Sequence, residues 1–235
     1  MRSISDDRGY NQGWASSQAT EVRTERRCNY IAGLMRTRSD ETVLEIGCGT
    51  GENAFLLASK TGKRILATDI CRPFLDQAAK LYERPNLSFQ FLDFRQVSGR
   101  ELGSFDYVVG NGILHHLYRD LEGSLVQMRR LLKPGGRIIF LEPNLLNPYC
   151  WFIFRYPILR KRAKLEPDEM AFSKSFIEAK LAAAGYRNIR VEYRDFLLPG
   201  IPAPLIRPSI AVGAVLEHVP ILRALAQSLF ISADT

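Results

Sequence analysis

The sequence predicts an α/β fold built on an open, mostly parallel sheet. Three observations lead to this prediction. From residue 42 onward, apolar β-favouring segments alternate with segments of helical character. A glycine-rich turn follows the first strand of this series. Polar residues follow the next strands at their carboxyl ends, where open parallel sheets bind ligands.

The first strand and its turn lie at residues 43–51, in the segment Val-Leu-Glu-Ile-Gly-Cys-Gly-Thr-Gly. Gly47, Gly49 and Gly51 permit positive φ angles and allow a ligand to approach the backbone. The N–H groups of such a loop suit a polar ligand group. Dinucleotide-binding loops space their glycines as G-x-G-x-x-G, whereas this loop is G-x-G-x-G. Glu45 precedes the first glycine by two residues and favours a positively charged ligand.

The elements follow in a regular order along the chain. We expect strands at 42–46, 64–70, 87–91, 105–112, 137–142, 188–193 and 228–233. We expect helices at 16–35, 51–60, 73–83, 113–132, 173–184 and 209–227, the fourth ended by Lys133-Pro134-Gly135-Gly136.

Acids follow the second and third strands. Asp69 comes about 20 residues after the glycine loop, where an acid can accept hydrogen bonds from both hydroxyls of a ribose. A helix cap is the alternative, because Pro73 follows closely. Asp93 follows the third strand, and its alternative is an ordinary turn aspartate.

The segments Val43–Gly51, Asp69, Asp93, Phe105–His116 and Leu131–Gly136 resemble, in order and spacing, the motifs of the class I S-adenosylmethionine (SAM) dependent methyltransferases. The resemblance covers residues 42–142. It implies a Rossmann-like sheet of seven strands with helices on both faces and an antiparallel last strand. One domain would then use the whole chain, 1–235.

The resemblance also implies a set of cofactor contacts. Glu45, Gly47, Gly49 and Gly51 would hold the methionine end of SAM, Asp69 and Ile70 the ribose, and Asp93 and Phe94 the adenine, with Phe94 packing on the ring. Asn111 would border the methionine moiety, and Arg26 would pair with the cofactor carboxylate. Further cofactor-binding candidates are Cys48, Asn53, Gly112 and Trp14.

His115 and His116 are the catalytic candidates, because they follow the fourth strand beside the expected methyl group. His116 is the better match, since it directly precedes the step Leu117-x-x-Asp120. The alternative is that both histidines only line the pocket. No metal is expected, because no carboxylate accompanies the pair at ligand spacing.

The residues after the fourth strand favour a small acceptor. Methylases that modify bases of nucleic acids carry Asn/Asp-Pro-Pro-aromatic there, whereas Asn111 is followed by Gly-Ile-Leu. We expect methyl transfer to oxygen or nitrogen of a small, partly apolar acceptor: a secondary metabolite, a sugar or a lipid-linked compound. One alternative is an RNA methyltransferase that uses the basic surface, since the net charge is +7. Another is a SAM-binding interaction protein without activity.

Three segments are expected to surround the acceptor. Residues 1–40 would form a helical lid, and insertions at 143–172 and 199–227 would cover the acceptor site. The alternatives for the insertions are completion of the core, a homodimer contact, or a surface that rests on a membrane, since aromatic residues flanked by Arg and Lys suit anionic lipid. Four scattered cysteines and the lack of a signal peptide or membrane span predict a cytoplasmic protein, with a peripheral membrane location as the variant.

Overall fold

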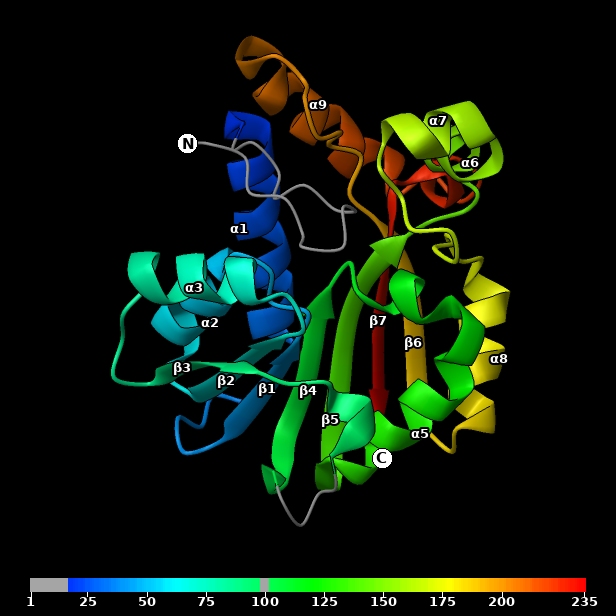
Figure 1. The fold of residues 1–235 in the computed structure, drawn as a ribbon. Helices are drawn as coiled ribbons and strands as arrows, with labels where there is room; N and C mark the ends of the chain where they lie inside the picture. Colours follow the sequence, from blue (N-terminus) through cyan, green and yellow to red (C-terminus); the bar gives the residue numbers. More distant parts are fainter. Residues whose placement is uncertain (1–16, 98–101) are drawn as a thin grey trace.

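The computed structural model describes residues 17–97 and 102–235, so the predictions for Trp14 lie outside the described residues. Its seven-stranded sheet has the order β3-β2-β1-β4-β5-β7-β6. The strands are β1 (Thr42–Ile46), β2 (Arg64–Asp69), β3 (Leu87–Phe91), β4 (Phe105–Asn111), β5 (Leu132–Pro143), β6 (Arg187–Arg194) and β7 (Ser228–Asp234). Neighbouring strands from β3 to β5 are parallel, and β7 is antiparallel to β5 and β6. The predicted fold, with its antiparallel last strand, is confirmed (Figure 1).

Helices cover both faces of this sheet (Figure 1). The α-helices are α1 (Gln18–Gly33), α2 (Glu52–Thr61), α3 (Arg72–Leu81), α5 (Leu121–Arg130), α6 (Pro148–Arg155), α7 (Pro157–Arg162), α8 (Lys174–Ala183) and α9 (Ala203–Leu216). The 3₁₀ helices are η1 (Phe94–Gln96), η2 (Leu114–Asp120) and η3 (Leu222–Leu225). The first three α-helices pack on one face, and α5 and α8 pack on the other.

The two hydrophobic layers divide along each central strand. Val108 and Phe140 pack toward α5 and α8, whereas Val109 and Ile139 pack toward the helices of the opposite face. All four side chains are completely buried. Successive strand residues point to opposite faces of a sheet, and apolar residues at consecutive positions therefore indicate a strand covered on both sides.

Two predicted helices differ from those observed. The helix expected at 113–132 begins as η2, because the carboxylate of Glu142 accepts the N–H groups of Ile113 and Leu114 and tightens this turn. The helix expected at 209–227 is α9, which starts earlier, in the proline-rich stretch, contains Pro208 and ends at Leu216. Turns and the short η3 follow in place of its predicted second half. Ile206 is buried against Leu197, and this contact holds the helix in place.

Residues 143–172 leave the sheet and return to it at nearly the same point. Asn144 and Phe172 form a β-bridge, and α6 and α7 lie between them. The guanidinium of Arg160 donates hydrogen bonds to the backbone oxygens of Phe154, Glu166, Pro167 and Glu169 at 2.8–3.1 Å. One partly buried cation thus holds together the two halves of this segment. Among the described residues, no helix combines the length and apolar character needed to cross a bilayer.

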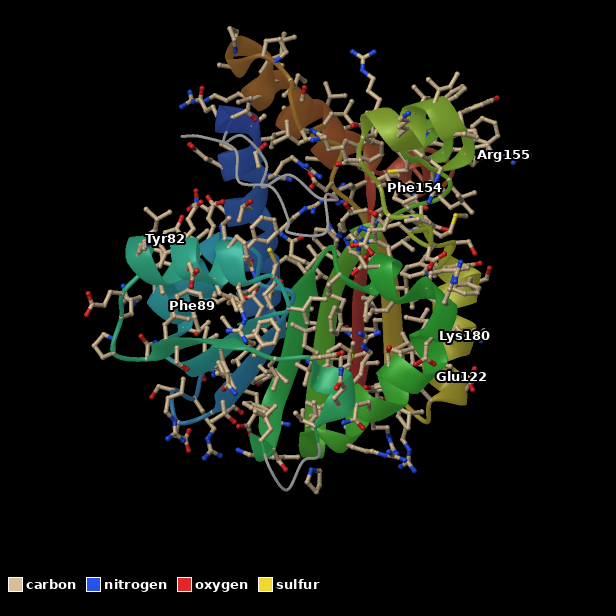
Figure 2. The ribbon with its side chains drawn as sticks, in the orientation of Figure 1. Tyr82, Phe89, Glu122, Phe154, Arg155 and Lys180 are labelled. Carbon is tan, nitrogen blue, oxygen red and sulfur yellow. The ribbon has the colours of Figure 1, made fainter. Side chains whose placement is uncertain are left out.

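Replacing Arg160 should therefore loosen this segment and leave the sheet intact. Arg160→Met removes hydrogen bonds from a charged donor, each contributing about 1.5–3 kcal/mol. We expect faster amide hydrogen exchange across 143–172 and unchanged protection in β4. Arg155→Met is the matched control, because Figure 2 shows Arg155 at the outer edge of the molecule. Equal exchange in both variants would contradict this role for Arg160.

Candidate active site

The glycine loop connects β1 to α2 and has two glycines with different constraints. Gly51 caps α2 with φ +85°, and a Cβ there would lie 2.7–2.9 Å from Ala78 and the Phe89 ring. Gly49 has φ +53°, and a Cβ there would meet no atom within 4 Å. Packing therefore requires a glycine at 51, whereas the loop at 49 borders open space that a ligand can approach.

Asp69 lies at the carboxyl end of β2 and contacts this loop. Its Oδ2 accepts the N–H of Gly49 at 2.8 Å, and its Oδ1 accepts the N–H of Cys71 at 2.8 Å. A carboxylate offers about four acceptor positions, so these two bonds are compatible with additional hydroxyl donors. Asp69 fixes the loop itself, which is a role that the spacing alone did not predict. The neighbouring Ile70 is 40% exposed.

Glu45 and Asn53 lie buried beside the loop. The Asn53 Nδ2 donates to Glu45 Oε1 at 2.7 Å. Burial raises the pKa of Glu45 to about 7. The hydrogen bond from Asn53 acts in the opposite direction, and the negative charge of Asp69 adds to the increase. Among the described residues, Glu45 Oε2 and Asn53 Oδ1 have no hydrogen-bond partner. Two buried acceptors without donors fit a ligand that brings donors or positive charge to this loop.

The acid after β3 is already engaged. Arg95 and Gln96 donate to the carboxylate of Asp93, and the hydrogen bonds from Arg95 lower its pKa to about 2. Phe94 is 4% exposed and packs in the core beside Ile46. Adenine contacts of Asp93 and Phe94 therefore stay predictions, and the buried ring of Phe94 does not favour stacking.

Two arginines of α1 reach the carboxyl end of β4. Arg27 donates to Asn111 Oδ1 at 3.0 Å and to Ser228 Oγ, and its Nε lies 3.3 Å from Asp195 Oδ2. The Arg23 Nε lies 3.6 Å from the same carboxylate oxygen. Burial and the neighbouring Arg27 lower the pKa of Arg23 to about 9. Two guanidiniums share one aspartate here, which leaves excess positive charge beside Asn111.

Arg26 was the arginine expected in that position. Arg27 takes this place instead, and the buried Nε of Arg26 has no hydrogen-bond partner among the described residues. On a helix, residues four apart lie on one face, which is why Arg23 and Arg27 reach the site together.

The two histidines on η2 are surrounded by carboxylates. His115 Nδ1 lies 2.7 Å from Glu142 Oε2, and His115 Nε2 lies 3.1 Å from Glu169 Oε1. Burial alone would lower the pKa of His115, but the hydrogen bonds and charges of the two glutamates outweigh it and raise the pKa to about 9. His115 is therefore an imidazolium at neutral pH. His116 Nδ1 lies 3.6 Å from Glu166 Oε1 and 3.7 Å from Glu169 Oε2.

The prediction that no carboxylate accompanies the two histidines is wrong. A carboxylate does accompany the pair, because the 143–172 segment brings Glu169 to it, and the ligand atoms of His115, His116 and Glu169 lie within 4.8 Å of one another. These residue types suit a divalent transition metal. Both nitrogens of His115 already contact carboxylates, however, so the arrangement is satisfied without an ion.

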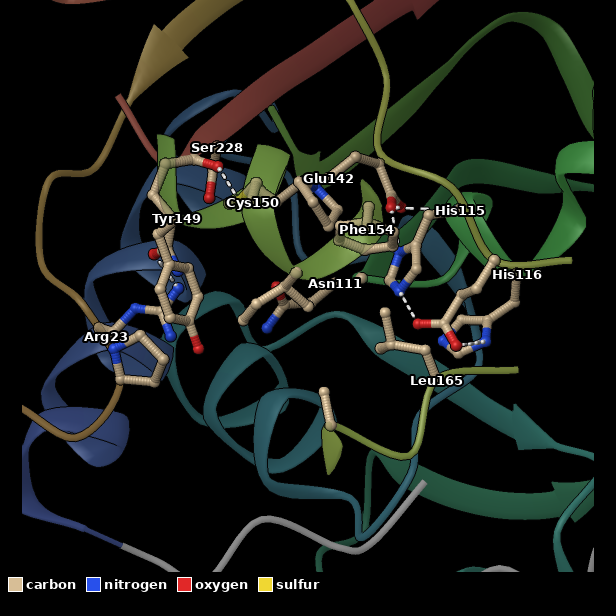
Figure 3. Close-up of a pocket in the computed structure, with 18 of the residues that line it drawn as sticks. Arg23, Asn111, His115, His116, Glu142, Tyr149, Cys150, Phe154, Leu165 and Ser228 are labelled. Carbon is tan, nitrogen blue, oxygen red and sulfur yellow. Dashed lines mark hydrogen bonds and ion pairs between the residues drawn. The ribbon is translucent and has the colours of Figure 1, made fainter. Parts of the chain in front are cut away.

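A cavity of about 690 Å³ joins Asn111, the arginines of α1 and the two histidines (Figure 3). Neither the glycine loop nor the acids Glu45, Asp69 and Asp93 are among its lining residues. The sheet contributes Asn111, Gly112, Glu142 and Ser228 to its wall; η2 contributes both histidines; α1 contributes Thr20, Arg23, Thr24 and Arg27; and the 143–172 segment contributes Tyr149, Cys150, Ile153, Phe154, Leu165 and Glu169. From the segment 199–227, Pro199 and Gln227 reach it. Ligand pockets of small molecules have volumes of about 300–1,000 Å³.

Part of this chain matches a known protein family. Residues 44–138 match a family model described as a methyltransferase domain. This match and the topology of the sheet support a class I SAM-dependent methyltransferase domain in this chain. SAM is the cofactor of this class, and the glycine loop with its unpartnered buried acceptors fits it.

Relatives agree with this identification. The methyltransferase is 27% identical over 146 residues to the O-methyltransferase resE of Aspergillus sclerotiorum, covering 60% of this chain and 54% of that protein. It is 27% identical over 171 residues to the ubiquinone/menaquinone biosynthesis C-methyltransferase UbiE of Desulfotalea psychrophila, covering 66% and 69%. The chain also matches two hybrid polyketide–peptide synthetases at 30% and 34% identity. The match spans only 3–4% of the length of those proteins. A SAM-dependent methyltransferase structure from Archaeoglobus fulgidus shares the fold, with a TM-score of 0.60, 18% identity and 94% and 95% of the two chains covered.

Several residues of this site were not predicted from the sequence. Glu142 lies near the end of a predicted strand, where a polar residue is common and indicates no particular role. Glu169 lies 54 residues after His115, in a segment without a recognised motif. Arg23 and Arg27 were visible only as part of an arginine-rich helix. An i, i+4 arginine pair on that helix was the one signal that could have found them.

Asp69→Ala should weaken SAM binding. The substitution removes an acceptor from Gly49 and from the predicted ribose hydroxyls, so we expect a loss of about 1–3 kcal/mol in binding free energy. Isothermal titration calorimetry measures it. Asp76→Ala, an exposed acid on α3, carries the same charge change and should bind SAM normally. Unchanged affinity in Asp69→Ala would remove it from the site.

The His115 imidazolium should make stability depend on pH. Its folded pKa of about 9 lies above the ordinary histidine value of about 6.5, so its stabilising contribution is full below pH 6.5 and disappears as pH rises through 9. Urea unfolding of the protein and of His115→Gln should give a stability difference that shrinks between about pH 6.5 and 9.5. A constant difference would contradict the charged form.

Proposed function

We propose that the protein transfers the methyl group of SAM to an oxygen or nitrogen of a small, partly apolar acceptor bound in the 690 Å³ cavity. The cavity is the observation that carries this proposal. Asn111 and the two histidines line it. The glycine loop that we propose to bind the cofactor lies nearby, because Gly47 packs against Ile113. Its other walls include Ile153, Phe154 and Leu165, which suit an apolar part of the acceptor.

SAM supplies an electrophilic methyl group on a sulfonium, so the protein's main task is to align the acceptor. Such positioning contributes effective molarities of about 10⁵–10⁸ M. The apolar side chains of the 143–172 segment exclude water from the cavity. Arg23 and Arg27, with one aspartate between them, supply positive charge for the cofactor carboxylate.

His116 is the base of this proposal. Its side chain lines the cavity and is 18% exposed, and it would take the proton that an acceptor hydroxyl must lose. His115 is already protonated at neutral pH and held on both nitrogens. It would instead hold Glu169 and the neighbouring His116 ring in position beside the reacting group.

An acceptor carbon next to a carbonyl is the second candidate. The same base could remove a proton from such a carbon, and the resulting enolate carbon would attack the methyl group of SAM. The relative UbiE is by name a C-methyltransferase, which supports this possibility.

The direct test incubates the protein and methyl-labelled SAM with a small-molecule extract of its host and identifies the labelled product and atom. His116→Ala should slow transfer by about 10²–10⁴-fold, the usual contribution of a general base, with SAM affinity unchanged. His218→Ala is the matched control, because this exposed histidine follows α9 outside the cavity. Tight SAM binding without any labelled product would contradict the proposal and favour a non-catalytic protein.

A further inference from the structure

Large apolar side chains cluster on the outer surface of α6 and α7. Trp151 is 40% exposed, Phe152 49%, Tyr156 45% and Ile158 82%. The three aromatic rings contact one another, with centroids 5.0–5.9 Å apart. The three rings thus form a continuous surface rather than scattered exposed residues, and Ile158 follows Tyr156 by two residues. We name these four side chains the aromatic patch.

The charged residues of the segment 143–165, which carries the aromatic patch, are all basic. Arg155, Lys161, Arg162 and Lys164 are exposed, and the sequence has no Asp or Glu from 143 to 165. Arg160, in contrast, is turned inward to backbone oxygens. An apolar patch with free cations at its edge complements a surface that is apolar inside and anionic at its headgroups.

A second apolar surface lies at the same end of the molecule. Figure 1 shows α9 and the α6–α7 pair beyond the sheet end toward which β4 and β5 point. On α9, Leu205 is 51% exposed, Val212 58% and Val215 65%. Arg162 and Leu165 line the cavity, so the basic edge of the patch is continuous with the acceptor site.

We propose that the aromatic patch and its four cations dock the protein on an anionic lipid bilayer. Aromatic rings at the headgroup level and basic residues beside them are typical of interfacial attachment. An RNA platform would also use aromatic and basic residues, but an aliphatic side chain as exposed as Ile158 has no partner on a polyanionic backbone. The proposal goes beyond methyl transfer, because docking does not depend on which atom is methylated.

Sedimentation with vesicles tests this docking. The full chain should sediment with vesicles of phosphatidylcholine plus phosphatidylserine, not with phosphatidylcholine alone, and salt should weaken the binding. Arg155→Gln/Lys161→Gln should lower partitioning on the order of tenfold or more, and Trp151→Ser/Ile158→Ser should lower it comparably. Leu81→Ser/Phe91→Ser is the matched control, because these exposed apolar residues lie on α3 and β3.

A second measurement leaves the patch intact. The chain has two tryptophans, so Trp14→Phe leaves Trp151 as the single tryptophan, whose fluorescence can be excited selectively. Vesicles of brominated phosphatidylserine should quench it. Absence of quenching, equal partitioning of the patch variants and the protein, or salt-sensitive RNA retention without vesicle binding would each overturn the proposal. A protein that does not bind vesicles but forms a dimer, which the patch variants abolish, would also overturn the proposal.

Discussion

Parallel pairing of β1 with β2 and β4 is the constraint on which the site depends. Leu44 lies in register with Leu66 on one side and with Val108 on the other. Because these strands end at the same edge of the sheet, the glycine loop, Asp69 and Asn111 arrive there together. The hydrogen bond from the Gly49 N–H to Asp69 then joins two strand ends directly. Within the described residues these groups are held by paired strand ends, so their convergence requires little further loss of entropy when a ligand binds.

Glu142 fixes the backbone beside the cavity, as Asp69 fixes the glycine loop. It ends β5 almost completely buried, accepts backbone N–H groups at the start of η2 and holds His115. Glu169 approaches the same imidazole from the opposite side. Burying an unpaired charge is costly, and the two carboxylates and the imidazolium offset one another's charge. The same contacts anchor the 143–172 segment over the cavity, so the charge balance of the site and the position of its cover depend on each other.

The sequence predicted the strands of the sheet and the residues at their ends, because strand periodicity, glycine turns and terminal acids are local patterns. It did not predict contacts between distant segments. Arg27 and Ser228 are 201 residues apart, and Glu169 reaches His115 only because the Asn144–Phe172 bridge closes its segment. Local competition explains other differences. Asp93 has Arg95 two residues away, and this ion pair engages the carboxylate. Pro208 lies inside α9 because the burial of Ile206 outweighs the propensity against it.

A crystal structure of the protein with S-adenosylhomocysteine tests the central claim most directly. The account predicts that the ligand lies between the glycine loop and Asn111, with its nucleoside beside Asp69 and its sulfur facing the cavity that His115 and His116 line. Binding elsewhere on the molecule, or a ligand that leaves Glu45 and Asp69 in separate environments, would contradict it.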